Sequence, residues 1–165
     1  MKLTLSVPLL LSTLVASKSF LFGNQQQPLV DDSLSVPGDN PLSFCANPSD
    51  YILTIEKVDL DPNPPEKGKA LQIKAKGNFT QKIEQDAYIN LSVKYGLITL
   101  INTQADLCEQ MKEVDESCPL EGAKDFTKDV TLPKQIPRGT YTVLADVYTK
   151  TDVQITCLRA IVHFS

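Results

Sequence analysis

The chain has 165 residues, which is the length of one domain with some additional sequence, and its apolar content of 42% is ordinary for a globular protein. The formal net charge is −4 and the lysines are scattered, so there is no basic patch of the kind that binds nucleic acid. The same acidic balance argues against adhesion to anionic membranes through charge alone.

The first 38 residues are predicted to precede the folded domain. Residues 1–17 have the pattern of a secretory signal peptide: Met1-Lys2 is a positive start, a short apolar centre follows, and Val15-Ala16-Ser17 supplies small residues at the exit. Residues 18–38 are polar and aperiodic, as is typical of a pro-segment or a flexible arm. The compact domain is therefore predicted over residues 39–165, in a vacuole-like lumen or outside the cell.

Strands dominate the rest of the chain. Residues 51–60 predict a strand that ends in a proline-rich break at residues 61–68. Residues 71–79 alternate apolar and polar side chains, which is the mark of a half-buried strand. Residues 87–97 alternate in the same way, and the apolar residues 97–101 follow directly.

Residues 104–113 are the one segment with a helical pattern. Further strands are predicted over residues 126–132, 140–148 and 153–164. About seven strands, separated by turn signals and with almost no helix, predict an all-β fold, an immunoglobulin-like antiparallel β-sandwich. A small barrel of the lipocalin kind is the nearest alternative.

Cys45, Cys108, Cys118 and Cys157 form an even set in an oxidising compartment, which predicts disulfides. Four cysteines allow three connectivities. The spacing favours a local Cys108–Cys118 bond and a long-range Cys45–Cys157 bond. Zinc is the rival interpretation, but the chain has no paired Cys-x-x-Cys and His163 is its only histidine, so no metal is expected.

The sequence does not assemble a catalytic constellation. Oxidised cysteines supply no thiolate nucleophile, and His163 near the C-terminus is typical of an ordinary packed or exposed imidazole. The acidic residues Glu109, Glu113, Asp115 and Glu116 indicate a solvated face rather than a catalytic pair. We therefore expect binding rather than catalysis, and no cofactor.

Two N-glycosylation sequons are present, Asn78-Phe79-Thr80 and Asn90-Leu91-Ser92. Both asparagines fall on the polar faces of predicted strands, so a glycan on Asn78 or Asn90 would reach solvent. In a secretory protein this pattern predicts a glycoprotein.

The proline-flanked loop at residues 133–139 leads directly into a predicted strand. Ile136 precedes Pro137 and is therefore poorly placed for a helix or a central strand. It either plugs the end of a core or lines the mouth of a cavity, and the apolar residues 97–101 present the same choice. Periodicity leaves a solid core and a hollow one equally open.

Three stretches together resemble a known family: Asp39-Asn40-Pro41-Leu42 leading to Cys45, residues 50–65 (DYILTIEKVDLDPNPP) and residues 132–141 (LPKQIPRGTY). They are similar to the ML lipid-recognition family, and in particular to its fungal phosphatidylglycerol/phosphatidylinositol transfer proteins. The luminal Niemann–Pick type C sterol carrier is a relative. The resemblance extends over residues 39–165.

This resemblance implies a sandwich whose two sheets separate to hold a lipid, without a cofactor, and it implies the pairs Cys45–Cys157 and Cys108–Cys118. It further implies a soluble luminal monomer that binds a sterol or a phospholipid, phosphatidylinositol or phosphatidylglycerol, and transfers it by transient membrane contact. A membrane-bound sterol transporter is an implied partner. One departure is the proline-rich turn at residues 62–68, which lacks the small disulfide of the animal carrier. A secreted immunoglobulin-like module with a solid core, or a small hydrolase, are the alternatives.

The lipid-binding residues are predicted from the inward strand faces and from the two mouth segments. By resemblance, the aromatic at the carrier's mouth falls near Leu100, and the second mouth segment falls near residues 136–141. We expect residues 97–101 and 133–139 to part during exchange. The predicted lining is Phe79, Leu91, Val93, Tyr95, Leu100, Ile136, Tyr141, Val143 and Val147.

Overall fold

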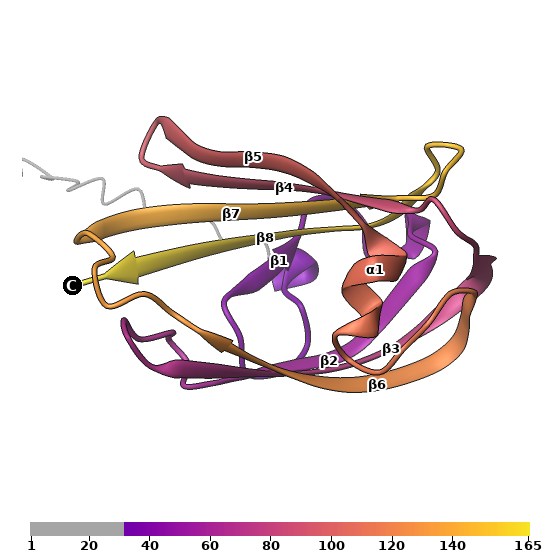
Figure 1. Ribbon diagram of the computed structural model, residues 1–165, viewed down its shortest axis with the longest axis horizontal. Helices are drawn as coiled ribbons and strands as arrows, with labels where there is room; N and C mark the ends of the chain where they lie inside the picture. The colour runs from indigo at the N-terminus through magenta and orange to yellow at the C-terminus, as the bar shows by residue number, and fades with distance from the viewer. Residues whose placement is uncertain (1–31) are drawn as a thin grey trace, which may run out of the picture. The chain divides into compact units, whose positions relative to one another are not determined.

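The structure is a computed structural model that describes residues 32–165; the predicted signal peptide lies outside the described residues. Within this range, eight strands form two antiparallel sheets, one with the order β1-β8-β7-β4-β5 and one with the order β2-β3-β6 (Figure 1). The strands are β1 (Leu42–Phe44), β2 (Leu53–Asp61), β3 (Ala70–Ile83), β4 (Tyr88–Tyr95), β5 (Ile98–Asp106), β6 (Leu120–Thr131), β7 (Gly139–Tyr148) and β8 (Gln154–Phe164). The helical pieces are α1 (Leu107–Lys112) and the 3₁₀ turns η1 (Asp32–Leu34) and η2 (Pro48–Asp50).

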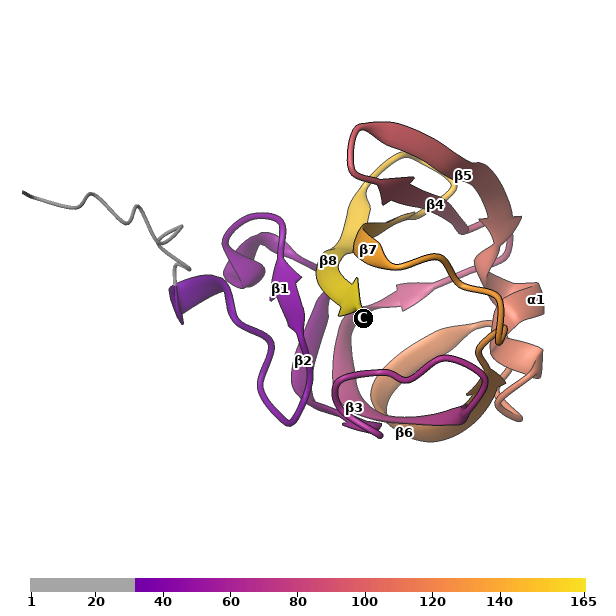
Figure 2. The ribbon, with the colours of Figure 1, turned by 90° about the vertical axis from the view of Figure 1, so that its left-hand side faces the viewer.

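The two sheets face each other as the layers of a sandwich, which confirms the predicted fold class (Figure 2). Alternation decides which side chains face inward. On β8, Leu158, Ala160 and Val162 face the opposite sheet and line the space between the sheets, whereas Arg159 and Ile161 lie on the outer face. None of the helices within residues 32–165 is long and apolar enough to cross a membrane.

Several element boundaries differ from the sequence prediction. The short strand β1 was not predicted; it pairs with β8, with Leu42 opposite Ala160. Strand β6 begins at Leu120 rather than at residue 126, because its half-buried face includes Lys124 and Gly122, which conceal the apolar alternation. Helix α1 is shorter than predicted because β5 continues to Asp106, whose carboxylate caps the helix by accepting from the Glu109 amide at 2.9 Å.

The predicted domain start at residue 39 falls inside the compact unit, which already includes the described residues before it. Val36 is buried in a core cluster, and its amide donates to the Leu42 carbonyl at 3.1 Å. The Val58 amide donates to the Pro37 carbonyl at 2.8 Å. Val36 and Pro37 belong to the segment that was predicted to be a pro-segment or a flexible arm. They therefore pack on the sandwich instead of preceding it.

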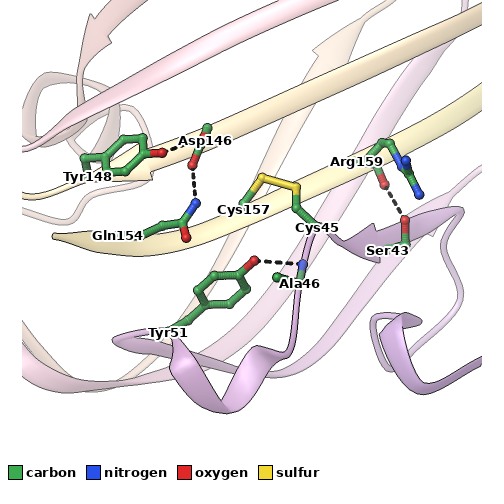
Figure 3. Close-up of a disulfide and its surroundings, with 9 residues drawn as sticks. All are labelled: Ser43, Cys45, Ala46, Tyr51, Asp146, Tyr148, Gln154, Cys157 and Arg159. Carbon is green, nitrogen blue, oxygen red and sulfur yellow. Dashed lines mark hydrogen bonds between the residues drawn. A yellow bond between two sulfur atoms is a disulfide. The ribbon is translucent and has the colours of Figure 1, made fainter. Parts of the chain in front are cut away.

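Both predicted disulfides are formed. Cys45, just after β1, bonds to Cys157 on β8, with a Cα–Cα distance of 5.4 Å across a sequence separation of 112 (Figure 3). Beside this bond, the Tyr51 hydroxyl accepts from the Ala46 amide at 3.1 Å. Cys108 and Cys118 join α1 to the segment before β6 across a separation of 10. The first bond holds the edge of the five-stranded sheet, and the second holds the helix.

The most deeply buried side chains of the core lie near α1. Ile83, Leu120 and Ile155 are the largest fully buried side chains, and Leu107 of the helix belongs to the same cluster. The helix and its disulfide therefore close one end of the sandwich. The other end is bordered by the turn between β4 and β5 and by the loop between β6 and β7 (Figure 1).

Candidate functional site

A cavity of about 670 Å³ lies between the two sheets at the end away from α1. Both sheets contribute to its walls, with Ile73 on β3 and Val143 on β7 as examples. Among the described residues that line it, Gln135 and Tyr141 bring the only polar side-chain groups, and no lining side chain is charged. The Tyr141 hydroxyl is already committed, because it donates to the Pro137 carbonyl at 3.1 Å. The site is therefore suited to an uncharged, largely apolar guest.

The cavity reaches the surface beside the β4–β5 turn. Leu100 and Ile101 line it while remaining 54% and 45% exposed. Leu97 and Ile98, at the tip of the same turn, are also exposed to solvent. The positive φ of 54° at Gly96 allows the tight turn. Exposed apolar side chains thus continue from the hairpin tip into the cavity.

The loop at residues 132–138 forms the opposite side of the mouth and is anchored by hydrogen bonds. The Leu132 amide donates to the Lys69 carbonyl at 3.0 Å, and the Tyr95 hydroxyl donates to the Arg138 carbonyl at 2.9 Å. Between these anchors, Ile136 lines the cavity and is half-buried. Of the two choices that the sequence leaves open for Ile136, the structure selects the mouth of a cavity.

A second cavity of about 290 Å³ lies deeper, next to α1. Leu107 and Met111 of the helix line it. Leu42, Val58 and Ile73 line both cavities and so mark the junction between them. The two cavities therefore lie end to end along the space between the sheets.

Two lysines border the deep cavity, and both form ion pairs. Of these lysines, Lys76 pairs with Asp125 at 2.9 Å and Lys124 pairs with Glu116 at 2.6 Å.

In the outer cavity, burial raises the pKa of Tyr141, and the neighbouring Tyr95 adds to the effect. Tyr141 therefore stays neutral at physiological pH, and the guest meets no net charge there.

Seven of the predicted lining residues are found in the cavities. The outer cavity is lined by Val93, Leu100, Ile136, Tyr141 and Val143. The deep cavity is lined by Phe79 and Val147.

Leu91 and Tyr95, which were also predicted to line the space, line neither cavity. Leu91 lies on β4 between Ile89, which lines the deep cavity, and Val93, which lines the outer one. Tyr95 packs instead against Tyr141, with ring centroids 5.2 Å apart. It therefore supports the cavity wall at Tyr141 without lining the cavity itself.

The sequence prediction missed many of the lining residues, and those on β8, β1 and α1 are examples. Val162 and Phe164 of β8 follow the alternation of that strand, which is a signal that could have identified them. Leu42 lies on the unpredicted strand β1. Met111 lies on α1, and no local pattern indicates that this helix faces a cavity.

The two sequons lie on strands. Asn78 on β3 and Asn90 on β4 are both half-buried. The Asn90 side-chain carbonyl accepts a hydrogen bond from the Gln104 side-chain amide at 3.1 Å. This bond uses the side-chain oxygen of Asn90 and not its side-chain nitrogen. Glycosylation of both residues stays a prediction.

An immunoglobulin-like sandwich with an uncharged apolar cavity between its sheets defines a class of protein that encloses an apolar small molecule. The family model that matches this chain is the ML domain, over residues 39–164. The chain belongs to the ML domain family, which confirms the predicted family resemblance.

Similar proteins agree with this assignment. The phosphatidylglycerol/phosphatidylinositol transfer protein of Pyricularia oryzae is 58% identical over 151 residues, covering 90% of this chain and 85% of the relative. The protein of the same name from Neurospora crassa is 51% identical over 168 residues, covering 99% of this chain and 94% of the relative.

Two solved structures share the fold. A Niemann-Pick type C2 protein from the Japanese carpenter ant has a TM-score of 0.53 at 11% identity, covering 75% of this chain and 98% of that one. Chicken MD-1 complexed with lipid IVa has a TM-score of 0.50 at 17% identity, covering 75% and 88%. At these identities the likeness concerns the fold alone.

Proposed function

We propose that this protein is a carrier that takes a sterol or the acyl region of a phospholipid between its sheets and transfers it between membranes. The observation that carries the proposal is the uncharged cavity of about 670 Å³ that opens beside Leu100. The names of the transfer proteins from Pyricularia oryzae and Neurospora crassa support it. The driving force is burial, since each methylene removed from water contributes about 0.8 kcal/mol.

The charge distribution determines how a phospholipid would sit. A phosphate group does not enter an uncharged cavity without a large desolvation cost. The acyl chains therefore occupy the cavity, and the headgroup stays at the wet mouth near Gln135. A sterol, which has a single hydroxyl, is enclosed more completely.

Transfer requires contact with a bilayer, and the β4–β5 turn is suited to make it. Leu97 and Ile98 project from the tip, beside the mouth. Insertion of these side chains between lipid headgroups brings the cavity mouth to the membrane surface, so a lipid crosses little water. Parting of the two mouth segments needs the Tyr95–Arg138 hydrogen bond to break.

We infer that the protein acts without catalysis or a cofactor. Alternation on β8 turns His163 to the outer face, away from the cavity that Val162 and Phe164 line. There its Nδ1 lies 3.2 Å from the Thr140 hydroxyl at an exposed position. An exposed pair outside the cavity has no bound substrate to act on, which disfavours the hydrolase alternative.

The disulfides are typical of a protein that folds in an oxidising compartment. We infer that the protein acts as a monomer in the secretory pathway, in a vacuole-like lumen or after secretion. A membrane-bound sterol transporter is the acceptor that we propose for a sterol ligand.

Two measurements test the carrier proposal. The protein is purified from its secretory host, and lipid that co-purifies is identified by mass spectrometry after extraction. Transfer of a fluorescent sterol and of phosphatidylinositol between phosphatidylcholine liposomes is then followed with time. We expect bound lipid and accelerated transfer of at least one class. A protein that contains no lipid and transfers neither class would favour the alternative of a binding module.

A further inference from the structure

Two strands at the edges of the sheets are covered by the chain itself. Along the free side of β2, the amides of Val58 and Leu60 donate to the carbonyls of Pro37 and Asp39 at 2.8 and 2.9 Å. Strand β1 has only three residues, and on the side away from β8 it bridges to Ser35. Short or covered edges of this kind prevent a sheet from pairing with another chain.

Strand β6, the other edge of the three-stranded sheet, is protected by charge. Five of its twelve residues are charged. Two of these, Lys124 and Lys128, form ion pairs with Glu116 and Glu113 of the segment that follows α1. Charged side chains along an edge oppose the approach of a second strand, because pairing would bury them.

Strand β5 has neither kind of protection. It is the outermost strand of the five-stranded sheet, and within residues 32–165 β4 is its only strand partner (Figure 1). It contains no proline or glycine, and residues 98–105 (ITLINTQA) carry no charge. All of its residues except Ala105 are exposed. The unpaired backbone amides and carbonyls of such an edge are a template for the addition of another strand.

The regular part of β5 is the segment available for pairing. The ladder between β4 and β5 shifts its register next to Lys94, so a bulge separates the start of β5 from the rest of the strand. Residues 101–106 pair evenly with β4 beyond that bulge. The middle of this uncharged regular segment is Thr103.

The regular segment is complementary to itself in the antiparallel direction. A two-fold axis perpendicular to the sheet at Thr103 places this residue opposite its own copy and keeps equivalent faces on the same side. Asn102 then lies opposite Gln104 of the second copy, and Ile101 lies opposite Ala105 of the second copy. Hydroxyl therefore meets hydroxyl, amide meets amide and methyl groups meet methyl groups, which are favourable cross-strand pairs.

The charges of the β4–β5 hairpin fit the same arrangement. Lys94 is the only charged residue of β4 and Asp106 the only one of β5. They lie at opposite ends of the hairpin, because Lys94 pairs with Thr99 whereas Asp106 pairs with Tyr88. An antiparallel pair of β5 strands brings the Lys94 end of each copy to the Asp106 end of the other. Opposite charges, and not like charges, therefore flank the interface.

We propose that β5 pairs with β5 of a second copy of this chain, so that two five-stranded sheets join into one continuous sheet, and that this dimer is a resting form of the carrier. The resting role rests on the proposed function. Leu100 and Ile101 of β5 line the cavity mouth while partly exposed. In the dimer the end of β5 from the second copy lies alongside them and covers this side of the mouth. The monomer remains the species that exchanges lipid.

Sedimentation equilibrium of the full chain from its secretory host tests the pairing. Asn90 on the neighbouring strand is a predicted glycosylation site, so N-glycans are first trimmed to a single sugar. Two paired strands form a small and therefore weak interface, so the protein is examined up to about 1 mM. We expect a reversible monomer–dimer equilibrium for wild type.

Thr103→Lys and Thr103→Glu each place like charges opposite one another at the two-fold axis. Either variant alone should dimerise at least about tenfold more weakly than wild type. An equimolar mixture of the two should form a dimer again, because the charges across the axis are then opposite. Restored association in the mixture also shows that both variants fold.

Thr131→Lys and Thr131→Glu are the matched controls. Thr131 is an exposed threonine at the end of β6, the edge strand of the other sheet. Both variants should dimerise as wild type does. Thr103→Cys should also form an intermolecular disulfide on mild oxidation, since opposite Cα atoms of paired strands lie about 4.5–5.5 Å apart, which is within disulfide range. Thr131→Cys should not.

The resting role is tested by the rate of lipid transfer per molecule of protein. For wild type this rate should fall as the protein concentration rises into the range where sedimentation shows a dimer. For Thr103→Lys it should stay constant over the same range. A wild-type rate per molecule that stays constant while the dimer forms would overturn the resting role.

The pairing is overturned if wild type remains monomeric at about 1 mM. It is also overturned if Leu97→Asp abolishes the dimer and Thr103→Lys does not, because the copies would then associate through the exposed apolar tip of the hairpin. Sedimentation does not depend on lipid transfer. A monomeric protein that transfers lipid therefore contradicts the dimer alone, and a dimer that never transfers lipid contradicts the carrier function and its resting form.

Discussion

The ring of Tyr95 packs so closely against Gly139 that a Cβ at position 139 would overlap the ring. The Tyr95 hydroxyl donates to the carbonyl of Arg138, the residue before this glycine, at 2.9 Å. Gly139 has a φ of 144°, which side-chain-bearing residues rarely adopt. One aromatic side chain at the end of β4 thus holds the start of β7 and, with it, one side of the cavity mouth.

Gly139→Ala should therefore destabilise the fold by about 2–4 kcal/mol, through backbone strain and the overlap with Tyr95. Urea unfolding measures the change. Gly96→Ala is the control, since Gly96 also has positive φ but a Cβ added there would meet no atom within 4 Å. It should cost only about 1 kcal/mol. Equal costs for the two variants would show that the contact with Tyr95 contributes nothing.

Leu100→Asp and Ile136→Asp should slow lipid transfer strongly while leaving the melting temperature nearly unchanged. A carboxylate at the mouth must be desolvated as an apolar lipid passes, whereas both positions are partly wet in the folded protein. Ile161→Asp is the matched control, because Ile161 is 58% exposed but lies on the outer face of β8. Wild-type transfer rates in both mouth variants, measured between liposomes, would mean that the mouth lies elsewhere.

The two disulfides should contribute unequally to stability. In the chain-entropy picture, the Cys45–Cys157 closure is worth about 4–5 kcal/mol and the Cys108–Cys118 closure about 3 kcal/mol, because the first closes a much longer loop. Double serine variants of each pair, compared by chemical denaturation, measure the difference. A larger loss from the short closure would argue that anchoring α1 matters more than loop length.

Stability should fall at high pH because of Tyr88. Its hydroxyl donates to the Asp152 carboxylate at 2.6 Å, and this hydrogen bond raises the pKa of Tyr88 from 10.0 to about 12. Folding thus favours the neutral phenol. The resulting stabilisation is complete below pH 10.0 and is lost as the pH rises through about 12.

Spectrophotometric titration of tyrosinate should show a group with a midpoint near pH 12 that disappears in Tyr88→Phe. Tyr148→Phe is the comparison, since Tyr148 stacks on Tyr88 but donates to Asp146. If Tyr88→Phe leaves the most alkaline part of the titration curve unchanged, the Asp152 hydrogen bond does not form in solution.

Protein from the secretory host should carry a glycan on Asn78, Asn90 or both. Enzymatic deglycosylation should increase its electrophoretic mobility, and Asn78→Gln and Asn90→Gln should assign the occupied site. Unchanged mobility after deglycosylation of wild type would contradict the prediction.

Alternation along single strands was sufficient to predict much of the candidate site. The two-residue period of β3 and β7 places Phe79, Val143 and Val147 on the inward face, because successive side chains of a strand point to opposite sides. The cysteine spacing favoured the two bonds that form, since it combines one local closure with one long one. The three stretches that resemble the ML family were also sufficient to identify it.

Only the tertiary structure decided whether the inward faces meet or stand apart. Periodicity reports which face a side chain occupies, but the separation of two sheets depends on every side chain between them and on the elements that close the ends. Leu91 and Val93 share one strand face, yet only Val93 lines a cavity.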